Sequence, residues 1–266
     1  MSISKPFDFL QSDTPLLVSM PHSGLRLTSP LRDTLVPEAL ALPDTDWYIP
    51  ELYDFLDDLG VGVIKANYSR YVIDLNRPQD NKPLYTSKTT GLFPHILFNE
   101  KPMFKVGSSI DKPHQKACIE HIWRPYHQQL SSELERLKQR FGYAILFDAH
   151  SIAAQVPMLF DGTLPDFNFG TNAGVACAPE LLAAAQQALA HTGYTQVSNG
   201  RFKGGYITRS HGQPSNNMHA FQLELSQATY LQNGSDYVLD NDKCAQVRPN
   251  LKALLQALLG CNLQPS

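Results

Sequence analysis

Two histidines follow apolar runs in this 266-residue chain, where we expect strands to end. His22 follows the run LLVS in the segment MPHSG, and His150 follows the run AILF in the segment DAHS. Asp44 and Asp46 lie between them in the segment LPDTDWY. Two imidazoles and one carboxylate form a zinc ligand set that leaves a fourth position for water. Histidines are also common as hydrogen-bonded structural residues, and acidic residues often precede helices, so the spacing alone leaves both interpretations open.

The segment SRYVIDLNR, residues 69–77, places Arg70 and Arg77 on either side of an apolar run, with Asn76 beside the second arginine. The planar guanidinium group binds carboxylates in bidentate geometry, and a strand end is a rigid place to hold it. This pattern indicates a binding site for an acidic substrate. The alternative is an ordinary surface ion pair with Asp74 or Asp80.

A carboxylate alternates with leucines in the segment FQLELSQ, residues 221–227. Glu224 in this expected strand can serve as a general base beside a metal ion, or it can be a structural partner of an arginine. The glycine-rich segment KGGYITRSHG, residues 203–212, contains Arg209. It matches neither a Walker nor a Rossmann pattern, so the sequence gives no support for a phosphate-binding loop.

Strands alternate with helices along the chain, which predicts a three-layer α/β sandwich in one domain covering residues 1–266. Residues 78–113 contain five prolines and little periodicity, so we expect a long ordered loop there that covers a site. The expected strands are 16–19, 61–66, 71–75, 144–147 and 221–225, and the expected helices are 50–59, 114–140 (interrupted at Pro125), 179–190 and 241–259.

The composition narrows the class of protein. The net charge of −3 and the absence of a basic stripe argue against nucleic-acid binding and favour a small-molecule substrate. The four cysteines contain no CxxC pair, which argues against a thiolate zinc site and a disulfide framework. No targeting segment or membrane-length apolar run occurs, so we expect a soluble cytoplasmic protein without a membrane partner.

Six motifs in order, PHSG, DTDWYIPELY, SRYVIDLNR, LFDAHS, FKGGYITR and LELSQATY, resemble those of the N-formylglutamate amidohydrolases. That family is similar to the zinc carboxypeptidase and aspartoacylase group. The resemblance implies a zinc carboxypeptidase-like α/β fold (phosphorylase/hydrolase-like) with a mixed central sheet. It also implies metal-dependent hydrolysis of N-formyl-L-glutamate to formate and L-glutamate, at the end of histidine degradation.

The resemblance also assigns residues. It implies one zinc ion per chain on His22, Asp46 and His150, with Glu224 as the base. Relatives in the wider group hold their first two ligands as His-x-x-Glu, but position 25 here is Leu25, so the acidic ligand must come from elsewhere. The motif match favours Asp46 over Asp44.

The resemblance further assigns the residues that would contact the substrate. Arg70 would stabilise the carbonyl oxyanion, and Asn76 with Arg77 would bind one carboxylate of the dicarboxylate substrate. Arg209 in the glycine-rich segment is our own candidate for the second carboxylate. The alternative reading of Arg209 is a solvated loop arginine.

Other functions remain open at this point. The chain could be a related zinc amidohydrolase acting on another N-acyl amino acid, a peptide or a cell-wall fragment. It could also be a non-catalytic binding protein of the same fold with a structural metal. A serine hydrolase is disfavoured because no G-x-S-x-G motif occurs. The oligomeric state cannot be read from the sequence.

Overall fold

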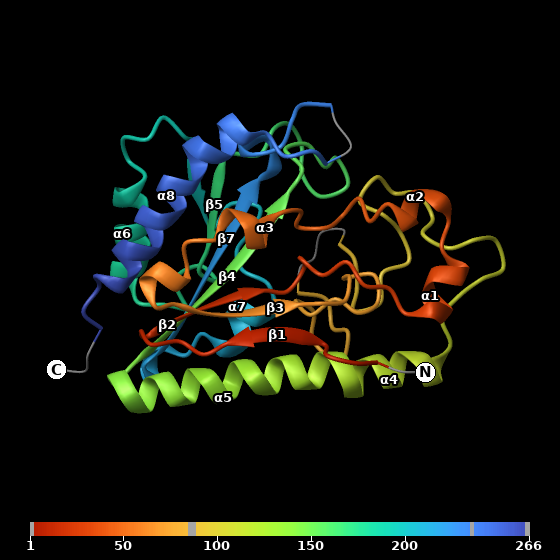
Figure 1. Ribbon diagram of the computed structural model, residues 1–266, viewed down its shortest axis with the longest axis horizontal. Helices are drawn as coiled ribbons and strands as arrows, with labels where there is room; N and C mark the ends of the chain where they lie inside the picture. The colour runs from red at the N-terminus through yellow and green to blue at the C-terminus, as the bar shows by residue number, and fades with distance from the viewer. Residues whose placement is uncertain (1–2, 85–88, 235–236, 264–266) are drawn as a thin grey trace.

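The computed structural model describes residues 3–84, 89–234 and 237–263 and is built on one mixed, seven-stranded sheet (Figure 1). The strand order is β1-β3-β2-β4-β7-β5-β6. The strands β3, β2, β4 and β7 run parallel, whereas β1 is antiparallel to β3 and β5 is antiparallel to β7. The strands are β1 (Phe7–Leu10), β2 (Leu16–Met20), β3 (Gly62–Ala66), β4 (Ala144–Ile152), β5 (Phe167–Gly170), β6 (Gln196–Ser198) and β7 (Met218–Ser226).

Helices cover both faces of the sheet, which confirms the predicted three-layer α/β fold with a mixed central sheet. The α-helices are α1 (Ser29–Thr34), α2 (Pro37–Leu40), α3 (Ile49–Leu52), α4 (Lys112–Cys118), α5 (Arg124–Phe141), α6 (Pro179–Ala188), α7 (Tyr206–His211) and α8 (Asn241–Leu259). Four short helical turns complete the described elements: η1 (Asp57–Leu59), the π-helical η2 (Ile119–Trp123), η3 (Pro214–Asn216) and η4 (Gln227–Thr229).

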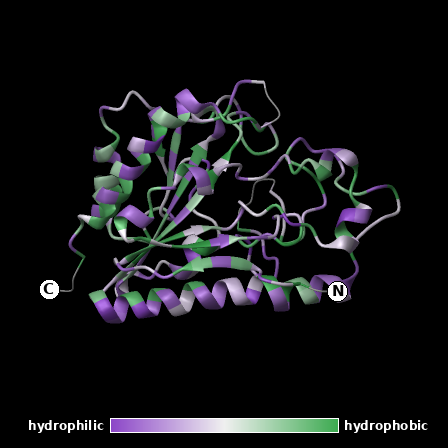
Figure 2. Ribbon diagram, in the orientation of Figure 1, coloured by the Kyte–Doolittle hydropathy of each residue, from purple (hydrophilic) through white to green (hydrophobic). Residues whose placement is uncertain are grey.

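Alternation along the strands divides the core into two hydrophobic clusters. In β4, Ile145 and Phe147 pack with α3, α6 and α8, whereas Ala144 and Leu146 pack with α5 and α7. Successive side chains of a strand point to opposite faces, so a central strand covered on both sides reads as a continuous apolar run. The outer helices α5 and α8 carry both hydrophilic and hydrophobic residues, as amphipathic helices on a core do (Figure 2).

The strand that carries His150 is longer than the sequence predicts. We expected it to end at Phe147, but β4 continues in parallel register with β7 through the pair Ile152↔Ser226. The polar residues Asp148, His150 and Ser151 are fully buried or nearly so, and a hydrophobicity pattern does not predict the burial of polar residues. His150 therefore lies inside a strand rather than after one.

The strand predicted at 71–75 is wrong. These residues form turns without a ladder partner, although Tyr71, Val72, Ile73 and Leu75 are all buried. A short apolar run cannot distinguish a buried strand from a buried turn, because both bury consecutive side chains. The flanking arginines are therefore held by a packed loop and not by strand ends.

Two helical predictions also need correction. The single helix over 50–59 is two short pieces, α3 and η1, because Tyr53 leaves the helical region at φ −103° and ψ 29° to pack on Phe147. Gly60 ends the segment with φ +62°, as a C-terminal glycine commonly does. The predicted helix over 114–140 is present as the contiguous elements α4, η2 and α5, and its interruption is the π-helical turn Ile119–Trp123 directly before Pro125, not Pro125 itself.

The other boundaries agree with expectation. The strand in 61–66 and the helices in 179–190 and 241–259 are present, and 78–113 is largely irregular in its described part. Residues 85–88 of that segment lie outside the described residues. Within the described part, none of the helices is long and apolar enough to cross a membrane. The four cysteines are free, and they are Cys118, Cys177, Cys244 and Cys261.

Candidate active site

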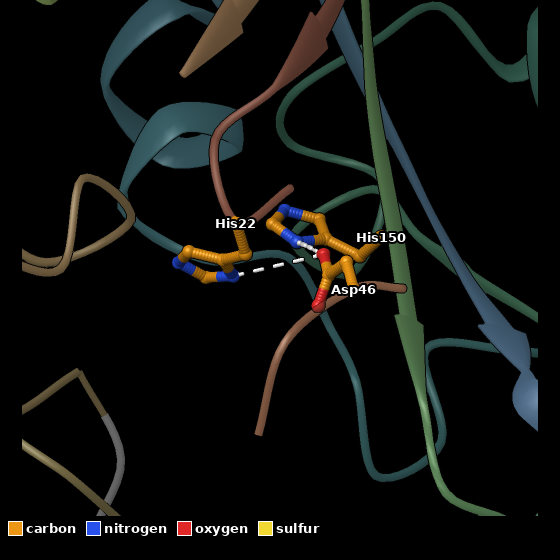
Figure 3. Close-up of side chains that lie close together, drawn as sticks. All are labelled: His22, Asp46 and His150. Carbon is orange, nitrogen blue, oxygen red and sulfur yellow. Dashed lines mark hydrogen bonds and ion pairs between the residues drawn. The ribbon is translucent and has the colours of Figure 1, made fainter. Parts of the chain in front are cut away.

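The structure brings His22, Asp46 and His150 together around one point (Figure 3). One ligand atom from each residue lies within 4.8 Å of the others, and all three residues are buried. Asp46 Oδ2 is 3.0 Å from His150 Nδ1 and 3.8 Å from His22 Nδ1. Both imidazoles thus present the same ring nitrogen to one carboxylate oxygen, as in a cluster that holds a metal ion.

Three different segments position this group. His22 lies in the turn directly after β2, His150 lies in the neighbouring strand β4, and Asp46 lies in the loop before α3. The amide of Asp46 donates a hydrogen bond to the carbonyl of His22 at 3.1 Å, which joins two ligands through the backbone. Gln227 Nε2 donates to the carbonyl of Thr45, and the Tyr230 hydroxyl donates to the carbonyl that follows Asp46. The motif LELSQATY therefore supports the aspartate loop from β7.

Asp44 does not belong to the group. Its carboxylate accepts hydrogen bonds from the Tyr71 hydroxyl at 2.8 Å and from the Phe98 amide at 3.1 Å. It therefore fixes the surrounding loops, and the geometry favours Asp46 as the acidic ligand.

Buried carboxylates contact the second ring nitrogen, Nε2, of both histidines. His22 Nε2 lies 2.7 Å from Asp74 Oδ1, and His150 Nε2 lies 2.9 Å from Asp148 Oδ2. Such contacts orient the imidazole and fix which ring nitrogen carries the proton. The Ser19 hydroxyl donates to Asp148 at 2.8 Å and so holds that carboxylate in turn.

The electrostatic surroundings differ between the two imidazoles. Burial and the nearby Arg70 lower the pKa of His22, although Asp74 opposes this. Burial would also lower the pKa of His150, but Asp148 and Asp46 outweigh it and raise that pKa well above its usual value. The carboxylates of Asp148 and Asp46 therefore favour positive charge at the His150 side of the group.

The residues of the SRYVIDLNR motif surround the same point. Arg70 forms an ion pair with Asp74 at 2.8 Å, and its guanidinium lies 4.8 Å from the centre of the Phe98 ring. The alternative of a surface ion pair is wrong for Arg70, because Asp74 is fully buried and also contacts His22. His22 and Arg70 hold the pKa of Asp74 well below its usual range against the cost of burial.

Asn76 connects this loop to the second histidine. Its Nδ2 lies 3.0 Å from His150 Nε2, and its Oδ1 accepts from the Ile207 amide at 2.8 Å. A Cβ atom at Gly205 would collide with the Asn76 amide, so the motif FKGGYITR needs glycine at this close approach.

The backbone of residues 75–77 is fixed from the side of α5. The carbonyl of Leu75 lies 3.0 Å from His127 Nε2, and the carbonyl of Arg77 accepts from Trp123 Nε1 at 3.0 Å. Arg77 Nε donates to the Thr90 carbonyl at 2.8 Å. The sequence analysis missed the hydrogen bonds from His127 and Trp123, because these two residues lie about fifty positions further along the chain.

Glu224 lies beside the metal-binding group. It pairs with His150 in the register of β7 and β4, and it is 7% exposed. Burial raises the pKa of Glu224 to about 8, with His150 opposing the shift. A carboxyl whose pKa lies close to neutral pH can both accept and release a proton, as proton transfer in catalysis requires.

A pocket of about 520 Å³, counted to where it opens to solvent, joins these residues. The predicted site residues that line it are His22, Arg70, Asn76, Arg77, His150 and Glu224. Asp46 lies beneath it through its contact with His150. Arg209 is not among the lining residues, and its Nε donates to the carbonyl of Gly204 at 2.9 Å. Arg201 lines the pocket and was missed, because the segment NGRFKGG offers no pattern that distinguishes it from a surface loop arginine.

Fold and site together define a class of protein. A mixed α/β sheet carries a buried His-Asp-His group between its central strands, with a buried glutamate on the next strand and arginines around one pocket. This arrangement is typical of a hydrolase with an α/β fold, and the buried group is one that could hold a metal ion.

Comparison with known proteins identifies the family. Residues 14–231 match the model of the N-formylglutamate amidohydrolase family. The chain is 54% identical over 258 residues to an N-formylglutamate deformylase of Pseudomonas putida, covering 97% of both chains. It is 50% identical to an N-formylglutamate deformylase of Pseudomonas aeruginosa, covering 94% of this chain and 95% of the relative. The chain belongs to the N-formylglutamate amidohydrolase family, as its motifs predicted.

Solved structures support the fold. The crystal structure of N-formylglutamate amidohydrolase from Ralstonia eutropha JMP134 superposes with a TM-score of 0.80 at 23% identity, covering 95% of this chain and 97% of that chain. A gene product of Agrobacterium tumefaciens gives a TM-score of 0.73 at 15% identity, covering 96% and 95%. At such identities the likeness concerns the fold alone.

Proposed function

We propose that this protein hydrolyses N-formyl-L-glutamate to formate and L-glutamate with one divalent metal ion, zinc, held by His22, Asp46 and His150. The observation that carries the proposal is the buried His-Asp-His group beside Glu224, in a chain that is 54% identical to an N-formylglutamate deformylase. The family resemblance also suggests that the reaction belongs to histidine degradation in the cytoplasm, with residues 1–266 acting as one domain.

The donor set fits zinc. Two imidazole nitrogens and one carboxylate oxygen from three separate segments are the kind of three-ligand set found in catalytic zinc sites, and a zinc ion held by them would have a fourth position for water. The carboxylates behind the two imidazoles supply the hydrogen bonds that such ligands ordinarily have. When bound, zinc supplies a Lewis acid that polarises the formyl carbonyl and makes water more acidic.

Glu224 moves the protons of the reaction. It accepts a proton from the attacking water as the new carbon–oxygen bond forms at the formyl carbon. It then delivers this proton to the amide nitrogen as the carbon–nitrogen bond breaks, so that formate and the free amine result. Gln222 Nε2 lies 3.5 Å from Glu224 Oε2 and limits where the carboxylate can turn.

The loop of residues 70–77 binds the polar parts of the substrate. Arg70 lies on the pocket wall with its charge fixed by Asp74, where it would stabilise the oxyanion that develops on the formyl oxygen. Arg77 and Asn76 would bind the carboxylate nearest the amide. Their backbone is fixed by the hydrogen bonds from α5, so this side of the pocket is organised before substrate arrives.

The experiment that tests the proposal is an assay of formate and L-glutamate released from N-formyl-L-glutamate by the zinc-loaded protein. N-acetyl-L-glutamate and an N-formylated dipeptide serve as comparison substrates. We expect equal amounts of the two products and a higher kcat/KM for N-formyl-L-glutamate than for either comparison substrate. Faster hydrolysis of the acetyl compound or the dipeptide would identify a different amidohydrolase.

A further inference from the structure

The proposed substrate has two carboxylates, so its pocket must neutralise a charge at each end. Leaving one of them unpaired in a partly dehydrated pocket is costly, because a carboxylate loses its hydration without gaining a partner. Three arginines line the pocket: Arg70, Arg77 and Arg201. Their different surroundings indicate which carboxylate each can serve.

Arg70 is the least suited to a carboxylate. Its guanidinium already faces the carboxylate of Asp74 at 2.8 Å, deep in the site. Much of its charge is therefore balanced inside the protein. This leaves it suited to the oxyanion, whose charge develops only during the reaction.

Among the described residues, the hydrogen-bond acceptors of the Arg77 guanidinium are neutral oxygens. Nε donates to the Thr90 carbonyl, and the two terminal nitrogens donate to the Asn76 carbonyl and the Thr89 hydroxyl. Its chain neighbour Asn76 contacts His150, one of the metal-binding residues. Arg77 therefore follows directly after a residue that contacts His150, and this position suits the α-carboxylate beside the amide.

Arg201 enters the pocket from a different part of the molecule. It lies in the loop after β6, and its Nε donates to the carbonyl of Leu159. The guanidinium also lies 5.6 Å from the centre of the Phe202 ring. Leu159 and Phe202 pack against a small apolar cluster that is separate from the two main cores. These contacts fix the arginine on an apolar part of the pocket wall.

We propose that Arg201 binds the γ-carboxylate of the substrate and so makes the pocket selective for acidic side chains. Arg201 lies on the pocket wall, and a guanidinium binds a carboxylate through paired N–H groups in a planar fork. The methylene groups of the substrate would lie along Leu159 and Phe202, which also line the pocket. This inference rests on the proposed function, because it assigns the second carboxylate of that same substrate.

The assignment replaces Arg209 as the second anchor. Both arginines flank the pair Gly204 and Gly205, but only Arg201 lines the pocket. Arg209 lies in α7 and donates from Nε back to the carbonyl of Gly204. Variants of the two arginines therefore allow a direct comparison between a residue that lines the pocket and a nearby residue that does not.

The test compares N-formyl-L-glutamate with N-formyl-L-glutamine, which has the same shape but a neutral side-chain amide. We expect Arg201→Gln to lower kcat/KM for N-formyl-L-glutamate by about 100-fold and to change kcat/KM for N-formyl-L-glutamine by less than about threefold. Arg201→Lys keeps the charge but loses the paired nitrogens, so it should recover part of the discrimination. Arg32→Gln, on the exposed surface of α1, is the matched control for loss of one positive charge.

Each outcome decides between named alternatives. Equal losses on both substrates in Arg201→Gln and Arg201→Lys would show that Arg201 only maintains the loop, and the inference would be overturned. Loss of discrimination in Arg209→Gln but not in Arg201→Gln would return the role to Arg209. If the wild-type protein hydrolyses neither substrate, the proposed function itself fails, and the Arg201 variants play no part in that conclusion.

Discussion

Replacing Asp74 by asparagine removes one charge from behind the metal-binding group without changing the size of the side chain. Asp74 is completely buried and accepts hydrogen bonds from Arg70 at 2.8 Å and from the amide of Asn76 at 2.9 Å. It also contacts His22 Nε2 at 2.7 Å. Asparagine has one acceptor oxygen, and its NH₂ group would face either Arg70 or His22, both of which need an acceptor.

Two effects of Asp74→Asn follow from these contacts. The loss of the contact that orients His22 should weaken metal binding by about 10- to 100-fold. The loss of the partner of buried Arg70 should lower the free energy of unfolding by about 3–5 kcal/mol, because the arginine charge stays buried without compensation. Competition with a chelator of known affinity measures the first effect, and urea unfolding of the metal-free protein measures the second.

Asp80→Asn is the matched control for this experiment. Asp80 follows the same motif, but it is exposed and its ion pair with Lys82 lies at the surface. We expect no measurable change in metal affinity in this variant. If Asp74→Asn lowered stability but left metal affinity within twofold of the wild type, Asp74 would be a structural ion-pair partner only, and the reasoning about His22 would be refuted.

Three further predictions address the ligands, the base and the pH dependence of stability. Asp46→Asn should remove most of the bound metal, whereas Asp44→Asn should retain it, and metal analysis showing the reverse would overturn the choice of ligand. Glu224→Gln should keep metal and fold but lower kcat by about 100-fold or more, and a near-normal steady-state rate would exclude Glu224 as the base. Burial lowers the pKa of His127 from 6.5 to about 3 and that of His211 to about 4, so the unfolded chain binds protons that the folded chain does not. Stability should therefore fall as the pH falls below about 6.5, by up to about 1.4 kcal/mol per pH unit for each histidine. His127→Gln should flatten this slope in urea unfolding between pH 6 and 4, and an unchanged slope would contradict the assignment.

The sequence predicts the layers of the fold because the information lies in local patterns. The parallel strands read as apolar runs, and the outer helices have helical periodicity, so their order alone indicates an α/β sandwich. Element boundaries failed where tertiary contacts decide them. The strand β4 continues through the polar residues Asp148, His150 and Ser151 because β7 pairs with it along its whole length, and no local pattern records that pairing.

The candidate site was also predicted only in part. The histidines and Asp46 were found from their positions and motifs. Asp74 appeared in the sequence only as a possible surface partner of an arginine, because burial depends on the packing of the 71–75 loop. Arg201 was missed for the same reason, since a loop arginine on a pocket wall and one in solvent look alike in a sequence.

The central claim is that one metal ion on the His-Asp-His group is needed for hydrolysis of N-formyl-L-glutamate. The most direct measurement titrates zinc into metal-free protein while formate release from N-formyl-L-glutamate is followed. We predict that activity is negligible without metal, rises in proportion to added zinc and reaches a plateau at one equivalent per chain. Full activity in the metal-free protein, or a plateau only at two equivalents, would contradict the account.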